Sequence, residues 1–229
     1  MGSMNNIRYE HKMITNENRL MDVLSLIRHH KALFRKQYPN RIVNNIYFDT
    51  HGLKSYLDHV SGASHREKKR IRWYGTPTDV IDHPVLEQKV RMGLVGDKLT
   101  ERLNPLPLDA TGPWPIPGNA ILHAKQFKDS LHWRLRSVHP VVAIRYYRHY
   151  FISADNQYRM TVDTNLEYFG ISLTGKPQRV SQLPAPLIIE LKYNKENAND
   201  AMNITNELPF RINRFSKYVF AIEGLRKNN

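Results

Sequence analysis

Alternation of apolar and polar side chains is the most regular pattern in this chain, and it predicts a series of β-strands. Residues 7–14 alternate in this way, in the order Ile7, Arg8, Tyr9, Glu10, His11, Lys12 and Met13. Because neighbouring side chains of a strand point to opposite faces, the pattern places apolar groups on one face and charged groups on the other. Similar alternation predicts strands over residues 43–49, 68–74, 85–90, 141–151, 158–163 and 187–193.

Helical spacing of apolar residues predicts helices between these strands. After an N-cap at Thr15 or Asn16, apolar residues recur at helical intervals and predict a helix to about residue 36, before Pro39. Two further helices are predicted over residues 199–207 and 213–226, and residues 56–60 suggest one more strand. A proline- and glycine-rich loop over 104–118 leads to a helical segment near 119–136, which Pro140 ends.

Basic residues outnumber acidic ones on the polar faces of the predicted strands. The basic residues are Arg8, Lys12, Lys68, Arg70, Arg72, Lys89, Arg159 and Lys192. The acidic residues are Glu10, Glu87, Asp163 and Glu190. Since the predicted helices carry apolar stripes, we expect them to cover the apolar face and leave the charged face inside a barrel. A sheet whose charged face simply meets solvent is the alternative.

The predicted fold is therefore α+β: an antiparallel β-barrel tunnel of about eight strands, with a charged lumen and helices packed outside. At 229 residues, with 41% hydrophobic and 24% charged residues, the chain fits a single globular domain. The first three residues resemble a vector scar ahead of Met4, so we expect the domain to span residues 4–229.

Composition narrows the chemistry and the location. The chain has no cysteine, which excludes a disulfide framework, a thiolate metal site and a cysteine nucleophile. No apolar run approaches the ~18 residues that span a bilayer, and no signal-like segment opens the chain, so we expect a cytoplasmic protein. The 34 basic and 21 acidic residues give a net charge of +13. This charge predicts a polyanionic partner: nucleic acid, polyphosphate, a nucleotide or an anionic membrane surface.

Three Glu-x-Lys pairs lie within predicted strands, and the two side chains of each pair share the polar face. The pairs are Glu10 with Lys12, Glu87 with Lys89 and Glu190 with Lys192. Any one of them could be a solvated ion pair. Together with the Arg70-x-Arg72 strand, they match a chain of phosphates held by guanidinium and ammonium groups. The interleaved carboxylates would oppose such a ligand unless Mg²⁺ or Mn²⁺ lies between them.

Several short motifs together resemble the VTC (vacuolar transporter chaperone) domain family, a polyphosphate polymerase family of the triphosphate tunnel metalloenzyme, or CYTH-like, superfamily. The motifs are residues 8–12 (RYEHK), 45–50 (NIYFDT), 70–75 (RIRWYG), 86–89 (LEQK), 159–164 (RMTVDT) and 215–218 (FSKY). They extend over nearly the whole chain in the order of the family. One departure is Arg8, which stands where the superfamily's Glu-x-Glu-x-Lys strand has its first carboxylate.

The resemblance implies an antiparallel tunnel barrel and an enzyme that transfers the γ-phosphate of ATP to a polyphosphate chain, with Mn²⁺ or Mg²⁺ as cofactor. The phosphate ligands expected from it and from the polar face are Lys12, Arg70, Arg72, Lys89, Lys98, Arg148, Arg159, Lys192 and Lys217. The expected catalytic residues are Arg70, Arg72, Lys89 and Glu190, and the expected metal ligands are Glu190 and Glu87. Lys98 falls in an expected loop at 96–98, and Lys217 falls on the predicted C-terminal helix.

Two other functions would use the same cradle. An inorganic triphosphatase would let water take the place of the chain end, and a binding module would hold polyphosphate or inositol phosphates without turnover. A nucleic-acid binder would need exposed aromatic residues for base stacking, whereas Phe48 and Trp73 are predicted on the buried face. The expected partners are therefore ATP or triphosphate and polyphosphate, with no nucleic acid. The family resemblance adds a membrane-protein partner at the inner face of a membrane.

Overall fold

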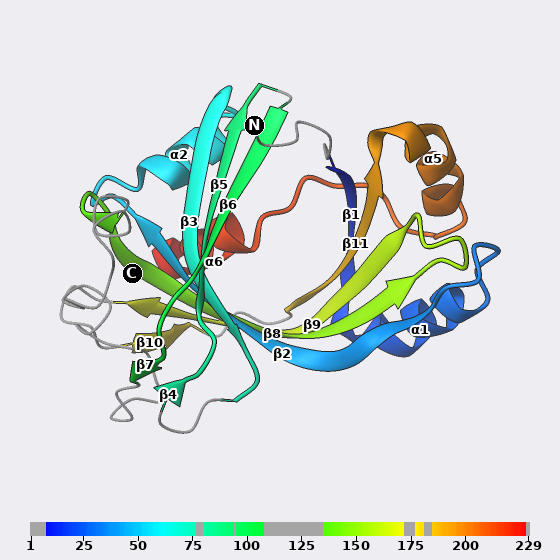
Figure 1. Cartoon of the computed structure of the whole chain (residues 1–229), viewed down its shortest axis with the longest axis horizontal. Coiled ribbons are helices and arrows are strands. Elements are labelled where there is room, and N and C mark those ends of the chain that lie inside the picture. Colours follow the sequence, from blue (N-terminus) through cyan, green and yellow to red (C-terminus); the bar gives the residue numbers. More distant parts are fainter. Residues whose placement is uncertain are drawn as a thin grey trace. The chain divides into compact units, whose positions relative to one another are not determined.

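The computed structural model describes residues 8–76, 80–93, 95–107, 135–171, 177–180 and 185–227 (Figure 1). Its strands are β1 (Arg8–Asn16), β2 (Arg35–Asp49), β3 (His65–Tyr74), β4 (Val80–Ile81), β5 (Val85–Met92), β6 (Val95–Arg102), β7 (Leu106–Pro107), β8 (His139–Ile152), β9 (Arg159–Ile171), β10 (Pro177–Val180) and β11 (Pro186–Asn194). Its helices are α1 (Leu20–Arg28), α2 (Lys54–Val60), α5 (Ala198–Asn206) and α6 (Lys217–Lys227), with the short 3-10 helices η1 (Glu17–Arg19) and η2 (Lys195–Asn197).

Most of the strands form one sheet. Its neighbouring strands follow the order β1, β11, β9, β8, β2, β3, β5 and β6, and β10 also pairs with β9. The pairings of β1 with β11, β11 with β9, β2 with β3, β3 with β5 and β5 with β6 are all antiparallel. β4 and β7 form a separate two-stranded sheet. The prediction of an α+β fold built on an antiparallel sheet of about eight strands is confirmed.

The chain divides into two compact units, and the three longest strands contribute to both. Unit 1 contains Met1–Arg41, Tyr146–Leu166 and Gln182–Phe215. Unit 2 contains Ile42–Arg145, Glu167–Ser181 and Ser216–Asn229. β2, β8 and β9 each begin in one unit and end in the other. The expected single domain over residues 4–229 stays a prediction.

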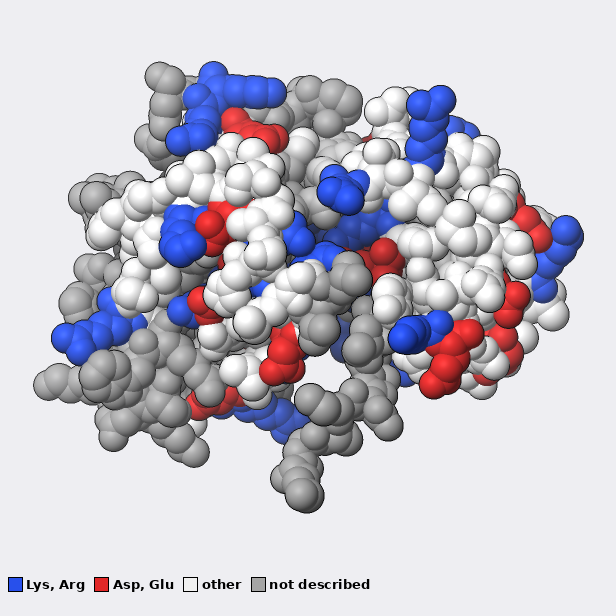
Figure 2. All heavy atoms as spheres, turned by 90° about the horizontal axis from the view of Figure 1, so that it is seen from above, with Lys and Arg blue, Asp and Glu red and all other residues white. Residues whose placement is uncertain are grey.

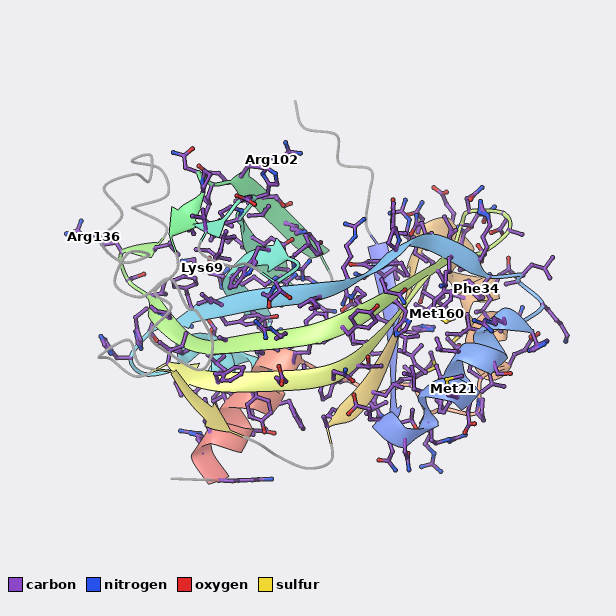
Figure 3. The ribbon with its side chains drawn as sticks, turned by 90° about the horizontal axis from the view of Figure 1, so that it is seen from below. Met21, Phe34, Lys69, Arg102, Arg136 and Met160 are labelled. Carbon is purple, nitrogen blue, oxygen red and sulfur yellow. The ribbon has the colours of Figure 1, made fainter. Side chains whose placement is uncertain are left out.

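The core of unit 1 is built by the alternation that predicted its strands. Met160 and Val162 of β9 lie on one face and are buried together with Leu191 of β11. The apolar stripe of α1 covers this face, because its residues recur at helical spacing. Phe34 and Met160, both labelled in Figure 3, belong to this core, whereas Met21 of α1 is 73% exposed.

Unit 2 has its own core, on the apolar face of three neighbouring strands. Ile71 and Trp73 of β3 pack with Ile46 and Phe48 of β2 and with Leu86 of β5. All five side chains are almost fully buried. The predicted burial of Phe48 and Trp73 is therefore confirmed, and the arginine side chains of β3 occupy the opposite face.

The first helix is shorter than predicted. α1 ends at Arg28, and β2 begins at Arg35. The backbone N–H of His29 hydrogen-bonds back into the last turn, and Leu33 then adopts a left-handed backbone with φ of 50°. A right-handed helix cannot continue through that conformation. Pro39, which was expected to end the helix, lies at an exposed position within β2.

Residues 56–60, predicted as a strand, belong to the helix α2 instead. Leu53 precedes this helix in a left-handed conformation with φ of 52°. The buried carboxylate of Asp49 accepts backbone N–H groups from Ser55 at 2.9 Å and Tyr56 at 3.0 Å. These donors belong to the first turn of the helix, where they have no partner within the helix itself. Because the carboxylate that caps the helix belongs to Asp49, outside residues 56–60, the local sequence pattern predicted a strand there instead of a helix.

Two other boundaries also differ from the prediction. Residues 96–98, expected as a loop, are part of β6. The last helix begins at Lys217 instead of near 213, because Ser216 Oγ accepts the backbone N–H of Val219 at 3.4 Å. Most of the predicted helix near 119–136 and most of the preceding loop lie outside the described residues. No helix in the described segments is both long and apolar enough to cross a membrane.

Candidate active site

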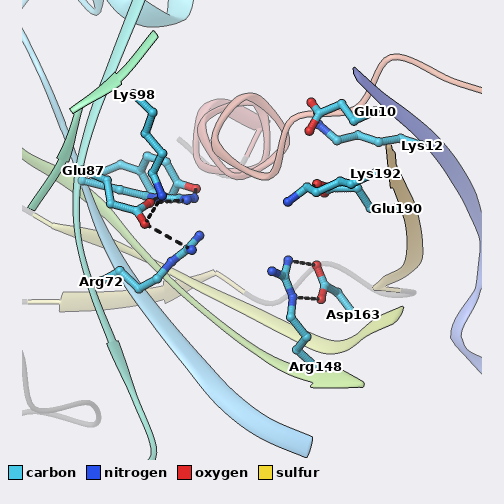
Figure 4. A network of polar contacts seen from close by, with 11 residues as sticks. Glu10, Lys12, Arg72, Glu87, Lys98, Arg148, Asp163, Glu190 and Lys192 are labelled. Carbon is cyan, nitrogen blue, oxygen red and sulfur yellow. Dashed lines mark hydrogen bonds and ion pairs between the residues drawn. The ribbon is translucent and has the colours of Figure 1, made fainter. Parts of the chain in front are cut away.

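One carboxylate gathers three cations on the charged face of unit 2. Glu87 of β5 lies directly opposite Arg70 of β3. Its Oε2 accepts a hydrogen bond from Arg70 Nε at 2.7 Å, and its Oε1 accepts one from Lys98 Nζ at 2.7 Å. Arg72 Nη1 lies 3.4 Å from the same Oε1, and Figure 4 marks this contact with a dashed line. Side chains from β3, β5 and β6 therefore meet at one point.

The charge of Glu87 is maintained by these three cations. Only 6% of Glu87 is exposed, and burial alone would raise the pKa of its carboxyl group. Arg70, Arg72 and Lys98 outweigh burial and lower the pKa to about 2. The carboxylate is therefore ionised at neutral pH, and it holds the two guanidinium groups in place.

Neutral groups from β2 fix the other sides of the two guanidinium groups. Arg70 Nη1 donates to Tyr47 Oη at 2.9 Å, and Arg72 Nε donates to Asn45 Oδ1 at 3.1 Å. Neither partner carries a charge, so both orient the arginines without cancelling their charge. The predicted site did not include them, although both lie on the polar side of the alternation in residues 43–49. Oriented guanidinium groups with spare positive charge suit phosphate oxygens.

A row of three lysines crosses the same face of unit 2. Lys68 of β3 lies opposite Lys89 of β5, which lies opposite Lys98 of β6. Because like charges directly opposite one another repel, an anion along this row is stabilised. Lys68 Nζ donates to Ser216 Oγ at 2.9 Å, next to Lys217 at the start of α6. The predicted ligand set missed Lys68 and Ser216, since their contact joins distant parts of the sequence.

Charges of alternating sign cover the polar face of β1 and β11 in unit 1. Glu10 lies opposite Lys192, and Lys12 lies opposite Glu190. Within each strand, Lys12 Nζ lies 2.8 Å from Glu10 Oε1, and Lys192 Nζ lies 2.8 Å from Glu190 Oε1. The two side chains of the first and third Glu-x-Lys pairs therefore share one face, as predicted, and each pair forms an ion pair. Arg159 of β9 lies opposite Lys192 and is exposed.

Other Glu-x-Lys pairs behave differently. Glu87 contacts the arginines of β3, and Lys89 joins the lysine row. A pair that the sequence analysis overlooked, Glu67 with Lys69, lies on the opposite face of β3, with Lys69 Nζ 3.3 Å from Glu67 Oε1. Figure 3 labels Lys69. The motif alone therefore does not mark the face that carries the candidate site.

Arg148 of β8 and Asp163 of β9 form a buried, two-pronged ion pair in unit 1. In the hairpin between β8 and β9, the backbone N–H of Ser153 donates to the carbonyl oxygen of Tyr158. Arg148 lies five residues before Ser153, and Asp163 lies five residues after Tyr158. The two residues therefore lie side by side on neighbouring strands. Arg148 Nε donates to Asp163 Oδ1 at 2.6 Å, and Nη2 donates to Oδ2 at 2.8 Å (Figure 4). Burial alone would lower the pKa of Arg148, but Asp163 keeps that pKa well above its ordinary value.

Glu190 is a carboxylate of unit 1 that fits a divalent cation. It is 7% exposed and lies opposite Thr161 of β9, whose buried Oγ1 has no hydrogen-bond partner among the described residues. Within that part of the chain, no three histidine, aspartate or glutamate side chains converge on one point. Mg²⁺ needs no such cluster, because one or two carboxylates commonly hold it together with substrate phosphates. A buried carboxylate beside an unsatisfied hydroxyl meets this requirement.

The predicted site residues fall into two groups, one in each unit. Unit 2 holds Arg70, Arg72, Glu87, Lys89, Lys98 and Lys217. Unit 1 holds Lys12, Arg148, Arg159, Glu190 and Lys192. Both oxygens of Glu87 contact cations, and the fork of Arg148 is occupied by Asp163. In these contacts, Glu87 and Asp163 position the cations that they bind. The roles of Glu87 as a metal ligand and of Arg148 as a phosphate ligand stay predictions.

Comparison with protein families identifies the chain. A family model of the VTC domain matches residues 7–226. The chain belongs to the VTC domain family. The match extends over both units of this VTC domain and includes every predicted site residue. A search of curated protein sequences with this VTC domain finds no match.

Solved structures resemble this VTC domain in fold. A candidate adenylate cyclase from Vibrio parahaemolyticus has a TM-score of 0.53 at 7% identity, covering 95% of this chain and 99% of its own. A candidate adenylyl cyclase from Hippeastrum, described as having a dominant triphosphatase activity, has a TM-score of 0.52 at 13% identity, covering 94% and 96%. A conserved hypothetical protein from Pyrococcus furiosus has a TM-score of 0.50 at 9% identity, covering 93% and 99%. At these identities the likeness establishes the fold.

Proposed function

We propose that this VTC domain is a metal-dependent phosphotransferase that moves the γ-phosphate of ATP onto a polyphosphate chain. The observation that carries the proposal is the cluster of Arg70, Arg72 and Lys98 around the buried Glu87. Three cations that share one carboxylate keep net positive charge for a ligand rich in phosphate oxygens. Phosphoryl transfer depends mainly on such positioning and charge stabilisation. The family assignment supports the same chemistry.

Each group of residues has a role in this proposal. In unit 2, the phosphoryl groups are bound by Arg70, Arg72, Lys89, Lys98 and Lys217. In unit 1, the proposed phosphate ligands are Lys12, Arg148, Arg159 and Lys192. Glu190 holds Mn²⁺ or Mg²⁺, which when bound neutralises charge on the phosphate oxygens. The tyrosine, asparagine and glutamate partners of the arginines keep the guanidinium groups oriented before substrate arrives.

An inorganic triphosphatase is the second candidate function. The Hippeastrum protein, which has the same fold, is described as having a dominant triphosphatase activity. In this reaction water takes the place of the chain end, while the same cations hold the phosphates. The two reactions therefore differ in their products and not in the residues that bind the phosphates. A cytoplasmic location, expected from the amino-acid sequence, and a membrane-protein partner, implied by the family resemblance, stay predictions.

Product analysis separates the two reactions. The purified protein is incubated with ATP or with inorganic tripolyphosphate in the presence of Mn²⁺, and the products are resolved by chain length. A polymerase yields chains longer than triphosphate from ATP. A triphosphatase yields only shorter phosphates from tripolyphosphate. A protein that consumes neither substrate would overturn both candidates and leave a binding module.

Substitution of Glu190 tests the role of the metal. Glu190→Gln keeps the size of the side chain but removes its charge, so we expect turnover to fall by roughly 100-fold or more. Glu223→Gln, at an exposed position of α6, makes the same chemical change outside both groups of residues. It should turn over substrate at the wild-type rate. Full activity in Glu190→Gln would contradict the assignment of the metal to this carboxylate.

A further inference from the structure

A hydroxyl group on the charged face of unit 1 is buried, and no described residue forms a hydrogen bond with it. Thr161 of β9 is 9% exposed, and its Oγ1 makes no hydrogen bond with any residue in the described segments. A hydroxyl that leaves water without gaining a partner costs free energy. A valine would fill nearly the same volume without this cost. The hydroxyl therefore indicates a ligand that binds beside Thr161 in the working protein.

The strand register shows which groups border this hydroxyl. Glu190 of β11 lies directly opposite Thr161, and side chains in such pairs are close neighbours on one face. Asp163, two residues along β9 on the same face, is engaged by both prongs of Arg148. The neighbouring acidic group that can share a ligand with Thr161 is therefore the carboxylate of Glu190, which is itself 7% exposed.

The two oxygens define the chemical class of the ligand. A phosphate beside Glu190 would meet a like charge, whereas a hard divalent cation accepts carboxylate and neutral oxygen ligands together. Threonine and serine hydroxyls serve Mg²⁺ in this way in the phosphate loops of unrelated nucleotide-binding proteins. We propose that Thr161 supplies, together with Glu190, a second protein oxygen for the divalent cation. This inference rests on the proposed function, in which Glu190 holds that cation.

A cation held by Glu190 would also affect Lys192. Lys192 Nζ lies 2.8 Å from Glu190 Oε1, and the lysine side chain is 38% exposed. A divalent cation held by the same carboxylate would repel the ammonium group of Lys192, which could then bind a phosphate instead. Thr161 and Glu190 would thus couple metal binding to the freeing of the Lys192 ammonium group from its ion pair with Glu190.

Replacement of Thr161 tests the inference through metal binding alone. Mn²⁺ affinity is measured without nucleotide, from the electron paramagnetic resonance signal of the free ion. Thr161→Val should weaken Mn²⁺ binding by about tenfold, while Thr161→Ser, which keeps the hydroxyl, should remain close to wild type. In EDTA, Thr161→Val should melt at a higher temperature than wild type, because the unsatisfied hydroxyl is gone. Mn²⁺ should then raise the melting temperature of wild type more than that of Thr161→Val.

A second threonine provides the matched control. Thr205 of α5 is 3% exposed, but its Oγ1 donates to Ala201 O at 3.0 Å. Thr205→Val should keep wild-type affinity for Mn²⁺. Equal Mn²⁺ affinity of Thr161→Val and wild type would overturn the inference. Loss of tripolyphosphate binding in EDTA with unchanged Mn²⁺ affinity would also overturn it, because the hydroxyl would then serve the anion.

The outcomes distinguish this inference from the proposed function. Wild-type protein that binds Mn²⁺ through Thr161 but consumes neither ATP nor tripolyphosphate would overturn the proposed function alone. Active wild-type protein whose Mn²⁺ affinity does not depend on Thr161 would overturn the inference alone. Wild-type protein that binds no Mn²⁺ would overturn both. Thr161→Ala removes the same hydroxyl and replaces Thr161→Val if the valine variant does not fold.

Discussion

Glu87 organises the cations of unit 2 although it carries the charge that a phosphate site usually avoids. It is buried and accepts hydrogen bonds from Arg70 and Lys98, with Arg72 nearby. Without this carboxylate, the three cations would lose the counter-charge that they share. The site therefore maintains its positive groups in a fixed arrangement by including one negative group. The cost of removing that group should be visible in the free energy of unfolding, without any ligand.

Glu87→Gln tests this role through pH dependence. The pKa of Glu87 is about 2 in the folded protein, below its ordinary value of 4.5. Ionised Glu87 therefore contributes stability that is fully present above about pH 4.5 and is lost as the pH falls towards 2. The shift corresponds to about 3 kcal/mol. We expect Glu87→Gln to lower the free energy of unfolding by about that amount at neutral pH, and we expect the difference to shrink in acid.

Urea unfolding at a series of pH values measures this difference. Glu223→Gln, at an exposed position of α6, removes one carboxylate without touching the cluster and should change the free energy of unfolding little at any pH. Tripolyphosphate should restore part of the stability lost in Glu87→Gln, because the anion supplies the missing counter-charge. A stability difference that is as large at pH 2 as at neutral pH would show that Glu87 acts through its shape and not through its charge.

At the scale of the elements, the sequence pattern predicted which face of a strand a side chain occupies better than it predicted which residues that side chain contacts. Period-two alternation in residues 68–74 placed Arg70 and Arg72 on one face and Trp73 on the other, as the structure confirms. It could not show that Arg72 meets Asn45, because that contact depends on the register of β2 against β3. The family motifs identified most of the basic residues, but not the neutral groups that orient them. Such partners become visible only when distant strands are paired.

The predictions of the helix boundaries were wrong for a related reason. Leu33 and Leu53 both adopt left-handed backbone conformations, which leucine rarely does and no local pattern signals. The start of α2 depends instead on Asp49, at the end of β2, whose carboxylate accepts backbone N–H groups from the first turn of the helix. Tertiary contacts therefore override the local preference for a strand over residues 56–60.

Tyr218→Phe tests how Asp49 joins these elements. Tyr218 of α6 donates a hydrogen bond to Asp49 Oδ2, so one buried carboxylate connects β2 with both α2 and α6. Burial and the hydrogen bond to Asp49 raise the pKa of Tyr218 far above its ordinary value of 10. The hydroxyl thus contributes stability that is fully present below about pH 10 and is lost at higher pH. We expect Tyr218→Phe to lower the free energy of unfolding by about 2 kcal/mol at pH 7.

Alkaline unfolding distinguishes this explanation from a simple packing defect. The stability of the wild type should fall steeply above about pH 10, whereas that of Tyr218→Phe should fall less. Tyr38→Phe removes a hydroxyl from a side chain that is 47% exposed, and it should follow the wild-type curve. If the free energies of unfolding of wild type and Tyr218→Phe changed with pH in parallel, the pKa of this hydroxyl would not differ between the folded and the unfolded protein.

At the scale of the whole molecule, the dominant property is an excess of positive charge. The chain carries a net charge of +13, and Figure 2 shows basic side chains at many points of the face drawn, with acidic ones among them. Such an excess destabilises a compact chain through self-repulsion. The lysine row of Lys68, Lys89 and Lys98 concentrates this repulsion within one sheet. Composition alone predicted a polyanionic partner, but only the strand register shows where like charges face one another.

Binding of tripolyphosphate should therefore stabilise the protein in a manner that depends on salt. We expect its addition to raise the melting temperature strongly at about 20 mM NaCl and much less at about 500 mM, since salt screens exposed charges. Lys89→Gln should reduce the rise, because Lys89 is the middle residue of the lysine row. Lys227→Gln removes the same charge from an exposed position at the end of α6 and should keep the wild-type response. Equal losses in both variants, measured by scanning calorimetry, would mean that net charge governs binding and that the register of the three lysines does not.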